Sequence, residues 1–127
     1  MSMKGLKTPL RYPGGKSRAV SKLIQWLPSR EITEYREPFL GGGSVALEMT
    51  KRLPEEIPIW VNDLYEPLFN FWVHLRDESD YLYKGLVSVR KEYDTEDKAR
   101  VLFNEAKEKL NESNTDNKDR ALYFYII

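Results

Sequence analysis

The spacing of apolar residues along the chain predicts short strands and helices in a definite order. Apolar residues recur at helical spacing between Ser17, a suitable N-cap, and Pro28, which ends the run. Residues 33–40 and 57–62 are predicted strands, and residues 44–53 between them a helix. After Asp63 the pattern predicts helices over 64–76, 81–93 and 96–110, a polar loop over 111–118, and a last helix or strand over 120–127.

This order of elements predicts an α/β fold. A helix between two strands is typical of a parallel β–α–β unit with a right-handed crossover. Only two strands are recognisable, fewer than the roughly five or six of a typical sheet, so we expect a partial Rossmann-like sheet with additional helices. The apolar run Leu122–Ile127 at the chain end has two interpretations. It is either a helix docked on the core or, as we favour, the end of a fragment or of half a split protein.

Composition narrows the chemistry that is open to the chain. The 127 residues include 20 basic and 20 acidic side chains, one histidine and no cysteine. This excludes a disulfide scaffold, a thiolate nucleophile and a cysteine- or histidine-rich metal site. No apolar run approaches the roughly 18 residues that cross a membrane, and the first ten residues lack the apolar stretch of a signal peptide. We therefore expect a cytoplasmic protein without membrane association.

The charge balance hides an asymmetry along the chain. Residues 1–30 contain no acidic residue, although the whole chain has as many acidic as basic residues. Seven basic residues lie in this segment: Lys4, Lys7, Arg11, Lys16, Arg18, Lys22 and Arg30. A block of one sign is typical of a surface that binds a polyanion, and a solvated basic arm is the alternative.

A glycine run between the first predicted strand and the following helix is the strongest local signal. Gly41, Gly42 and Gly43 permit positive φ angles and a close approach of a ligand to the helix N-terminus. Asp63 ends the next predicted strand, where an acid accepts hydrogen bonds from ribose hydroxyls in nucleotide-binding folds. The pair indicates a site for an adenosyl or dinucleotide ligand; a simple tight connection is the alternative. The run fits the dinucleotide pattern only if its last glycine is relaxed to Ala46.

A second loop signal precedes the first predicted helix. The residues Arg11-Tyr12-Pro13-Gly14-Gly15-Lys16 place an aromatic ring, two glycines and a lysine together. Such a loop can stack on a planar base and neutralise a carboxylate, or be an ordinary connection. Gly15-Lys16-Ser17 resembles the end of a P-loop, but Leu10 stands where that motif needs its first glycine. Among the later aromatics we expect core positions: Phe69, Phe71, Trp72, Tyr81 and Tyr83.

The motifs together resemble one known family. The segments PLRYPGGKSR (9–18), REPFLGGGSVAL (36–47) and VNDLYEPLFNFWVHL (61–75) are similar, in order and spacing, to the amino-terminal motifs of Dam-type (D12 class) DNA adenine-N6 methyltransferases. The closing ALYFYII (121–127) is similar to the segment that leads into target recognition in this family. The resemblance implies S-adenosylmethionine as cofactor and double-stranded DNA as substrate. It also implies that residues 1–63 bind the cofactor and that residues 64–127 lead toward a recognition and catalytic region.

The resemblance assigns roles to eleven residues. Tyr12 and Lys16 would line the cofactor pocket, with Gly14 and Gly15 allowing close approach. Glu37, Phe39 and the turn Gly41, Gly42 and Gly43 would pass beside the methionine portion. Asp63 would hold the ribose hydroxyls, and Leu64 would lie near the adenine. A carboxylate such as Glu37 would offset the positive sulfonium; a salt bridge or a helix-dipole contact is its alternative role.

One departure from the family concerns catalysis. The catalytic motif Asp-Pro-Pro-Tyr or Asn-Pro-Pro-Tyr is absent, because no Pro-Pro occurs in the 127 residues. We therefore assign no catalytic residue and expect this chain alone to be inactive. One alternative is a non-catalytic cofactor- or DNA-binding module that pairs with a second chain. Others are a nicotinamide-dependent enzyme and an interaction protein without a ligand, and unpaired strand edges also allow a homo-oligomer.

Overall fold

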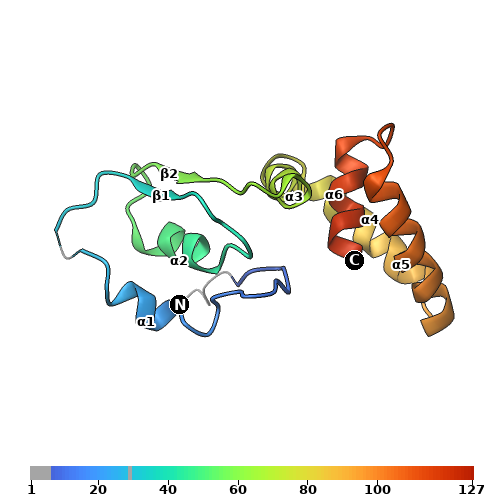
Figure 1. Ribbon diagram of the computed structural model, residues 1–127, viewed down its shortest axis with the longest axis horizontal. Coiled ribbons are helices and arrows are strands. Elements are labelled where there is room, and N and C mark those ends of the chain that lie inside the picture. The colour runs from blue at the N-terminus through green and yellow to red at the C-terminus, as the bar shows by residue number, and fades with distance from the viewer. Residues whose placement is uncertain (1–6, 29) are drawn as a thin grey trace. The chain divides into compact units, whose positions relative to one another are not determined.

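The computed structural model describes residues 7–28 and 30–127 (Figure 1). The chain divides into two compact units, Met1–Leu64 and Tyr65–Ile127. The first unit contains both strands, and the second consists of helices. Within the described part of the chain, no helix is long and apolar enough to cross a membrane, and no cluster of acidic or histidine side chains is suited to hold a metal ion.

The first unit contains a two-stranded parallel sheet. Strands β1 (Tyr35–Glu37) and β2 (Ile59–Val61) pair with Tyr35 opposite Ile59 and Glu37 opposite Val61. Helix α2 (Ser44–Arg52) connects them, which confirms the predicted parallel β–α–β order. Regular pairing is shorter than the predicted strands, but it continues past β1, where the Leu40 N–H donates to the Asn62 carbonyl at 2.8 Å.

The first predicted helix is much shorter than expected. Helix α1 covers only Val20–Ile24, and its N-cap is Ala19, without a side-chain capping bond. The assignment of Ser17 as the cap is therefore wrong. Turns flank the helix on both sides, with the Ala19 N–H donating to the Lys16 carbonyl. No residue of α1 is buried, so tertiary packing gives little support for further helical turns.

The two faces of the sheet differ in burial. Leu40, Ala46 and Met49 are buried in the first unit, two of them on α2. Arg36 and Trp60 are exposed on the strands, and the Arg36 guanidinium lies 6.0 Å from the Trp60 ring centroid. Parallel sheets are normally covered on both faces. The structure is thus a mixed helical fold with a small parallel sheet, compatible with the α/β class, and the two strands alone do not confirm the predicted partial Rossmann-like sheet.

The second unit is a bundle of four helices. They are α3 (Glu66–Asp77), α4 (Ser79–Glu92), α5 (Glu96–Asn111) and α6 (Asn117–Ile126), and α6 packs against the other three. The end of the chain is therefore a docked helix rather than a strand. The apolar side chains buried between the helices are Leu68, Phe71, Leu82, Leu102, Ala106, Leu110 and Ala121.

Polar contacts also tie this bundle together. The buried Asn70 on α3 donates from Nδ2 to the Asn117 carbonyl at 2.9 Å. Arg120 on α6 binds both carboxylate oxygens of Glu66, at 3.0 and 2.6 Å, and its Nε donates to the Leu110 carbonyl at 3.3 Å. Hydrogen bonding by the Arg120 guanidinium lowers the pKa of Glu66. One arginine thus joins α3, α5 and α6.

The predicted aromatic core is only partly correct. Phe71 is 2% exposed, and its ring centroid lies 5.7 Å from that of Phe124 and 5.8 Å from that of Tyr125. Phe69, Tyr81 and Tyr83 are exposed, so the expectation that they are core residues is wrong. A helix turns by about 100° per residue. Neighbouring aromatics therefore point in different directions, and residue type alone does not tell which one faces the bundle.

Candidate functional site

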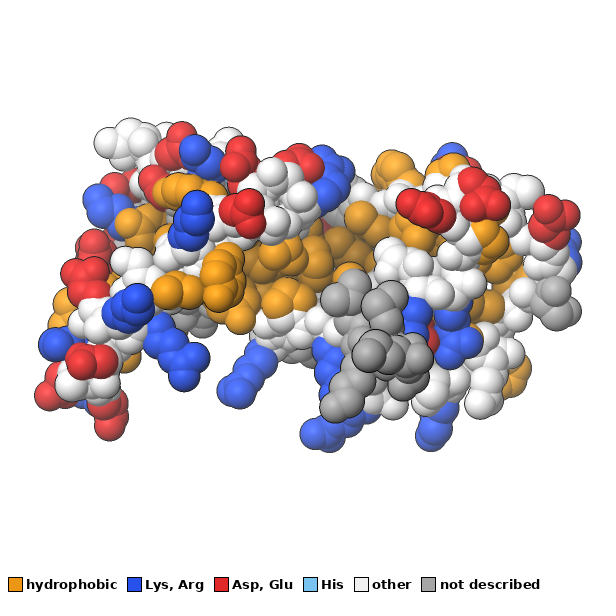
Figure 2. Space-filling model, turned by 180° about the vertical axis from the view of Figure 1, so that it is seen from behind, with side chains coloured by type: hydrophobic (Ala, Val, Ile, Leu, Met, Phe, Trp, Pro, Cys, Tyr) orange, Lys and Arg blue, Asp and Glu red, His pale blue; other side chains and the backbone are white. Residues whose placement is uncertain are grey.

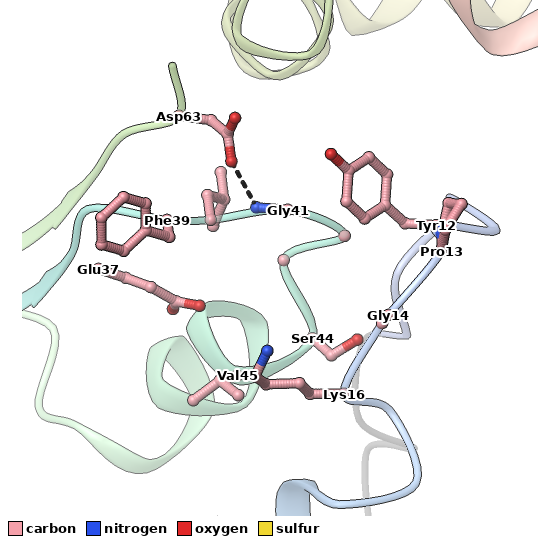
Figure 3. A pocket seen from close by; sticks show the side chains of 14 residues that line it. Tyr12, Pro13, Gly14, Lys16, Glu37, Phe39, Gly41, Ser44, Val45 and Asp63 are labelled. Carbon is pink, nitrogen blue, oxygen red and sulfur yellow. Dashed lines mark hydrogen bonds between the residues drawn. The ribbon is translucent and has the colours of Figure 1, made fainter. Parts of the chain in front are cut away.

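A pocket of about 280 Å³ lies in the first unit, where the strands end and α2 begins (Figure 3). Three segments line it: residues 12–16, residues 37–45 except the proline at position 38, and Asp63. Ten of the eleven predicted ligand residues lie on its wall: Tyr12, Gly14, Gly15, Lys16, Glu37, Phe39, Gly41, Gly42, Gly43 and Asp63. The eleventh, Leu64, is 91% exposed and does not line the pocket.

The first wall is a tight turn. The Gly15 N–H donates to the Tyr12 carbonyl at 2.9 Å, with Pro13 and Gly14 between them. Gly14 has a φ of 73°, and proline followed by a residue of positive φ is the pattern of a type II turn. A Cβ at position 15 would lie 2.9 Å from the Tyr12 carbonyl oxygen. The sequence Tyr-Pro-Gly-Gly therefore suits this turn at each position.

The turn is held against the glycine run by Tyr12, a predicted site residue, and by Thr8, which sequence reasoning missed. The Thr8 hydroxyl donates to the Gly42 carbonyl and accepts a hydrogen bond from the Leu10 N–H at 3.2 Å. A Cβ at Gly42 would lie 3.2 Å from the Tyr12 Cβ. Threonine in a loop carries no motif that reveals such a contact. Thr8 and Tyr12 thus join the two loop signals of the sequence into one site.

The glycine run forms the floor of the pocket and starts α2. Gly41 and Gly43 have φ values of 54° and 73°, which residues other than glycine rarely adopt. The N-cap, Gly43, makes no side-chain capping bond. The Ser44 hydroxyl lines the pocket wall and is a buried polar atom without a hydrogen-bond partner among the described residues. The helix N-terminus therefore faces the pocket with its positive dipole end.

Asp63 has a structural contact that the sequence did not reveal. Its Oδ2 accepts a hydrogen bond from the Gly41 N–H at 2.9 Å, as the dashed line in Figure 3 shows. This bond continues the strand pairing beyond the Leu40–Asn62 bond, with a carboxylate in place of a carbonyl. Asp63 therefore anchors the glycine run. A carboxylate offers about four acceptor positions, so the same group can also accept hydrogen bonds from a ligand.

Glu37 is the second carboxylate of the pocket. Burial holds the pKa of Glu37 above its ordinary value. Hydrogen bonds from the Tyr35 hydroxyl and the Ala46 N–H, together with the nearby Lys16 ammonium, act in the opposite direction but do not cancel this effect. The Tyr35 hydroxyl donates to Glu37 Oε2 at 3.2 Å. The bond from Ala46, in the first turn of α2, matches the helix-dipole role that was the alternative for Glu37. The carboxylate nevertheless lies on the pocket wall (Figure 3), where it also faces a ligand.

We expect Gly15→Ala to destabilise the first unit by about 1–3 kcal/mol. The added methyl group would lie too close to the Tyr12 carbonyl oxygen, a backbone atom of the same turn. Urea unfolding followed by circular dichroism measures the change, and Ser17→Ala at an exposed position nearby is the matched control. Equal stability of the two variants would show that the turn adapts without cost.

Comparison with known proteins identifies the family. The chain matches the D12 class of N6 adenine-specific DNA methyltransferases over residues 12–127. The chain belongs to this family. The match includes all eleven predicted ligand residues and extends over part of the first unit and all of the second, and it agrees with the resemblance seen in the motifs.

A curated relative adds the extent of the match. The chain is 26% identical over 117 residues to the type II methyltransferase M.MjaIII of Methanocaldococcus jannaschii. The alignment covers 87% of this chain and 40% of the relative. The chain thus spans about two-fifths of the length of the curated relative that it matches.

Proposed function

We propose that these 127 residues form the cofactor-binding portion of an S-adenosylmethionine-dependent, site-specific DNA adenine-N6 methyltransferase. The observation that carries this proposal is one pocket in a D12-class chain, lined by two glycine-containing loops and two carboxylates. Ligands of open α/β sheets bind at the carboxyl ends of the strands, which is where this pocket lies.

The pocket fits the chemistry of S-adenosylmethionine. The cofactor carries ribose hydroxyls, a positive sulfonium, and an amino acid group with both charges. Asp63 and Glu37 supply acceptors and negative charge, and Lys16 supplies positive charge. The absence of side chains at Gly41 and Gly42 lets Tyr12 pack closely against the backbone of the pocket wall. The volume of about 280 Å³ is slightly below the roughly 300–1,000 Å³ typical of ligand pockets. These features support a site that further protein completes.

Each residue then has a separate task in binding. Asp63 would accept bonds from the ribose hydroxyls while it holds Gly41, and Lys16 would pair with the amino acid carboxylate. Glu37 would face the positive groups of the ligand, and Tyr12 would form the side wall. Phe39 and Leu64 are 83% and 91% exposed, so we propose that they contact the cofactor only when further protein covers them. When bound, S-adenosylmethionine supplies an electrophilic methyl group on its sulfur.

The DNA substrate requires residues beyond this pocket. Orienting the amine of a flipped adenine is the task of the Asp-Pro-Pro-Tyr motif, which these 127 residues lack. The basic segment would contribute phosphate contacts, which depend on salt and not on base sequence. Its six described basic residues are all exposed, and Lys4 lies outside the described residues. Figure 2 shows Lys and Arg side chains gathered along the lower edge of the first unit, and acidic side chains along its upper edge.

The uncovered sheet supports a second polypeptide as partner. In this two-stranded parallel sheet Arg36 and Trp60 are exposed on one face, which further protein could cover. The outer strand edges could also form hydrogen bonds with strands of another chain. We propose that a chain with the catalytic motif completes this sheet, as part of a type II methyltransferase of a restriction–modification pair. A second copy of this chain, or a module that binds without catalysis, is the alternative.

A complementation assay tests the proposed function. The purified chain is mixed with a separately expressed segment that carries the catalytic motif, and methyl transfer from labelled S-adenosylmethionine to duplex DNA is measured. We expect no transfer by either part alone and transfer by the mixture, abolished by Asp63→Ala. If the mixture stays inactive although the two parts associate, the non-catalytic module is the better description.

A further inference from the structure

We propose that Tyr35 is a positioning residue for this site, whose hydroxyl holds the Glu37 carboxylate against the pocket wall. This inference rests on the proposed function and deepens it, because Glu37 is the acceptor that would face the positive groups of the cofactor. Tyr35 itself does not line the pocket. It acts through Glu37, and neither the motifs nor the family match assigns it a role.

The geometry of β1 places the two side chains together. Residues two apart on a strand lie on the same face, and Tyr35 and Glu37 are both half-buried beside the exposed Arg36. The Tyr35 N–H donates to the Pro58 carbonyl at 3.0 Å, and the residue pairs with Ile59 across the sheet. The phenol is thus carried by a fixed part of the backbone. Its hydroxyl reaches Glu37 Oε2 at 3.2 Å.

The contacts of Glu37 come from three elements. Tyr35 lies on the same strand, the Ala46 N–H is on α2, and the Lys16 ammonium belongs to the first loop. Asp63, on the segment after β2, is the other carboxylate of the pocket. Lys16 is exposed, so solvent screens its attraction. The two hydrogen bonds, one from Tyr35 and one from the helix, therefore set the direction of the carboxylate.

A tyrosine suits this task because it stays a donor. Burial, the charge of Glu37 and the hydrogen bond raise the pKa of Tyr35 to about 12. The phenol is therefore protonated throughout the physiological range and stabilises the ionised carboxylate. Burial favours the neutral form of Glu37. Loss of the hydroxyl would remove one interaction that stabilises the ionised carboxylate. The pKa of Glu37 would then rise further, and Glu37 would take up a proton at a higher pH.

The first test is Tyr35→Phe, which keeps the ring and removes only the hydroxyl. The carboxyl carbon of Glu37 is followed by NMR through a pH titration of the free 127-residue chain. We expect the pKa of Glu37 to rise by roughly one, and no change in Tyr83→Phe, whose ring is 70% exposed in the second unit. An unchanged Glu37 titration in a folded Tyr35→Phe chain would overturn the proposal.

A reciprocal measurement covers the case in which Tyr35→Phe does not fold. In Glu37→Gln the phenol loses its charged partner, and we expect the pKa of Tyr35 to fall from about 12 toward its ordinary value of roughly 10. Ultraviolet absorption of tyrosinate, with Tyr35 assigned by NMR, measures this. An unchanged pKa of Tyr35 in Glu37→Gln would contradict the coupling.

The consequence for the ligand separates this inference from the proposed function. Affinity for S-adenosylmethionine should fall as the pH drops through the pKa of Glu37, because the neutral carboxyl no longer attracts a cation. In Tyr35→Phe this loss of affinity should begin at a pH that is higher by roughly one pH unit. Altered Glu37 titration without cofactor binding, either by the chain alone or in the complementation mixture, would reject the proposed function but confirm the coupling. Binding with identical pH profiles in both proteins would reject the positioning role.

Discussion

Replacing Asp63 with alanine is expected to weaken S-adenosylmethionine binding by about 100-fold or more. A hydrogen bond to a charged group contributes about 1.5–3 kcal/mol, and about 1.4 kcal/mol corresponds to a factor of ten in affinity. The substitution removes the proposed bonds to the ribose and also the acceptor of the Gly41 N–H, which lies 2.9 Å from Asp63 Oδ2. Isothermal titration calorimetry on the purified chain measures the change.

Two further variants separate the roles of Asp63. Asp63→Asn keeps an oxygen acceptor for the Gly41 N–H but loses the charge, so its affinity should lie between those of the wild type and Asp63→Ala. Glu55→Ala removes an exposed acid of the same unit that does not line the pocket, and it should bind as the wild type does. Full affinity in a folded Asp63→Ala chain would refute the assignment of Asp63 to the ribose. Absence of binding by the wild type would show that the pocket needs further protein.

Phe71→Ala is expected to destabilise the second unit by about 3–5 kcal/mol, the usual cost of truncating a buried phenylalanine. Phe71 is 2% exposed, and its ring contacts those of Phe124 and Tyr125 on α6. Its loss therefore leaves a cavity between α3 and α6, the helix that packs against the other three helices of the second unit. Urea unfolding followed by far-ultraviolet circular dichroism gives the change in the free energy of unfolding.

Tyr83 provides the matched control for this prediction. It is an aromatic residue of the same unit, but its side chain is 70% exposed. Tyr83→Ala should therefore change the free energy of unfolding by no more than about 0.5 kcal/mol. Similar losses in both variants would show that Tyr83 is covered in solution, by a second copy of the chain or by another protein.

Sequence reasoning predicted the elements well where one local signal dominated. Apolar spacing located α2 to α5 to within a few residues, and the glycine run and Pro54 marked the ends of α2, because helix periodicity is a short-range property. The last segment was predicted as a helix or a strand, and it is the helix α6. Sequence reasoning failed for α1, where apolar residues recur at helical spacing but none is buried. It also assigned exposed rings such as Tyr83 to the core, because burial depends on which face of a helix meets its neighbours.

The sequence by itself determined the parts of the site that depend on local backbone chemistry. Tyr-Pro-Gly-Gly and Gly-Gly-Gly-Ser specify turns that need positive φ angles and small residues. The same residues form part of the motifs by which the family is recognised. Tertiary structure alone decided which side chains support these turns. The contacts of Thr8 with Gly42, Tyr35 with Glu37, and Asp63 with Gly41, like the exclusion of Leu64 from the pocket wall, depend on strand pairing and loop packing. These contacts join residues that the fold brings together, and no local sequence pattern predicts them.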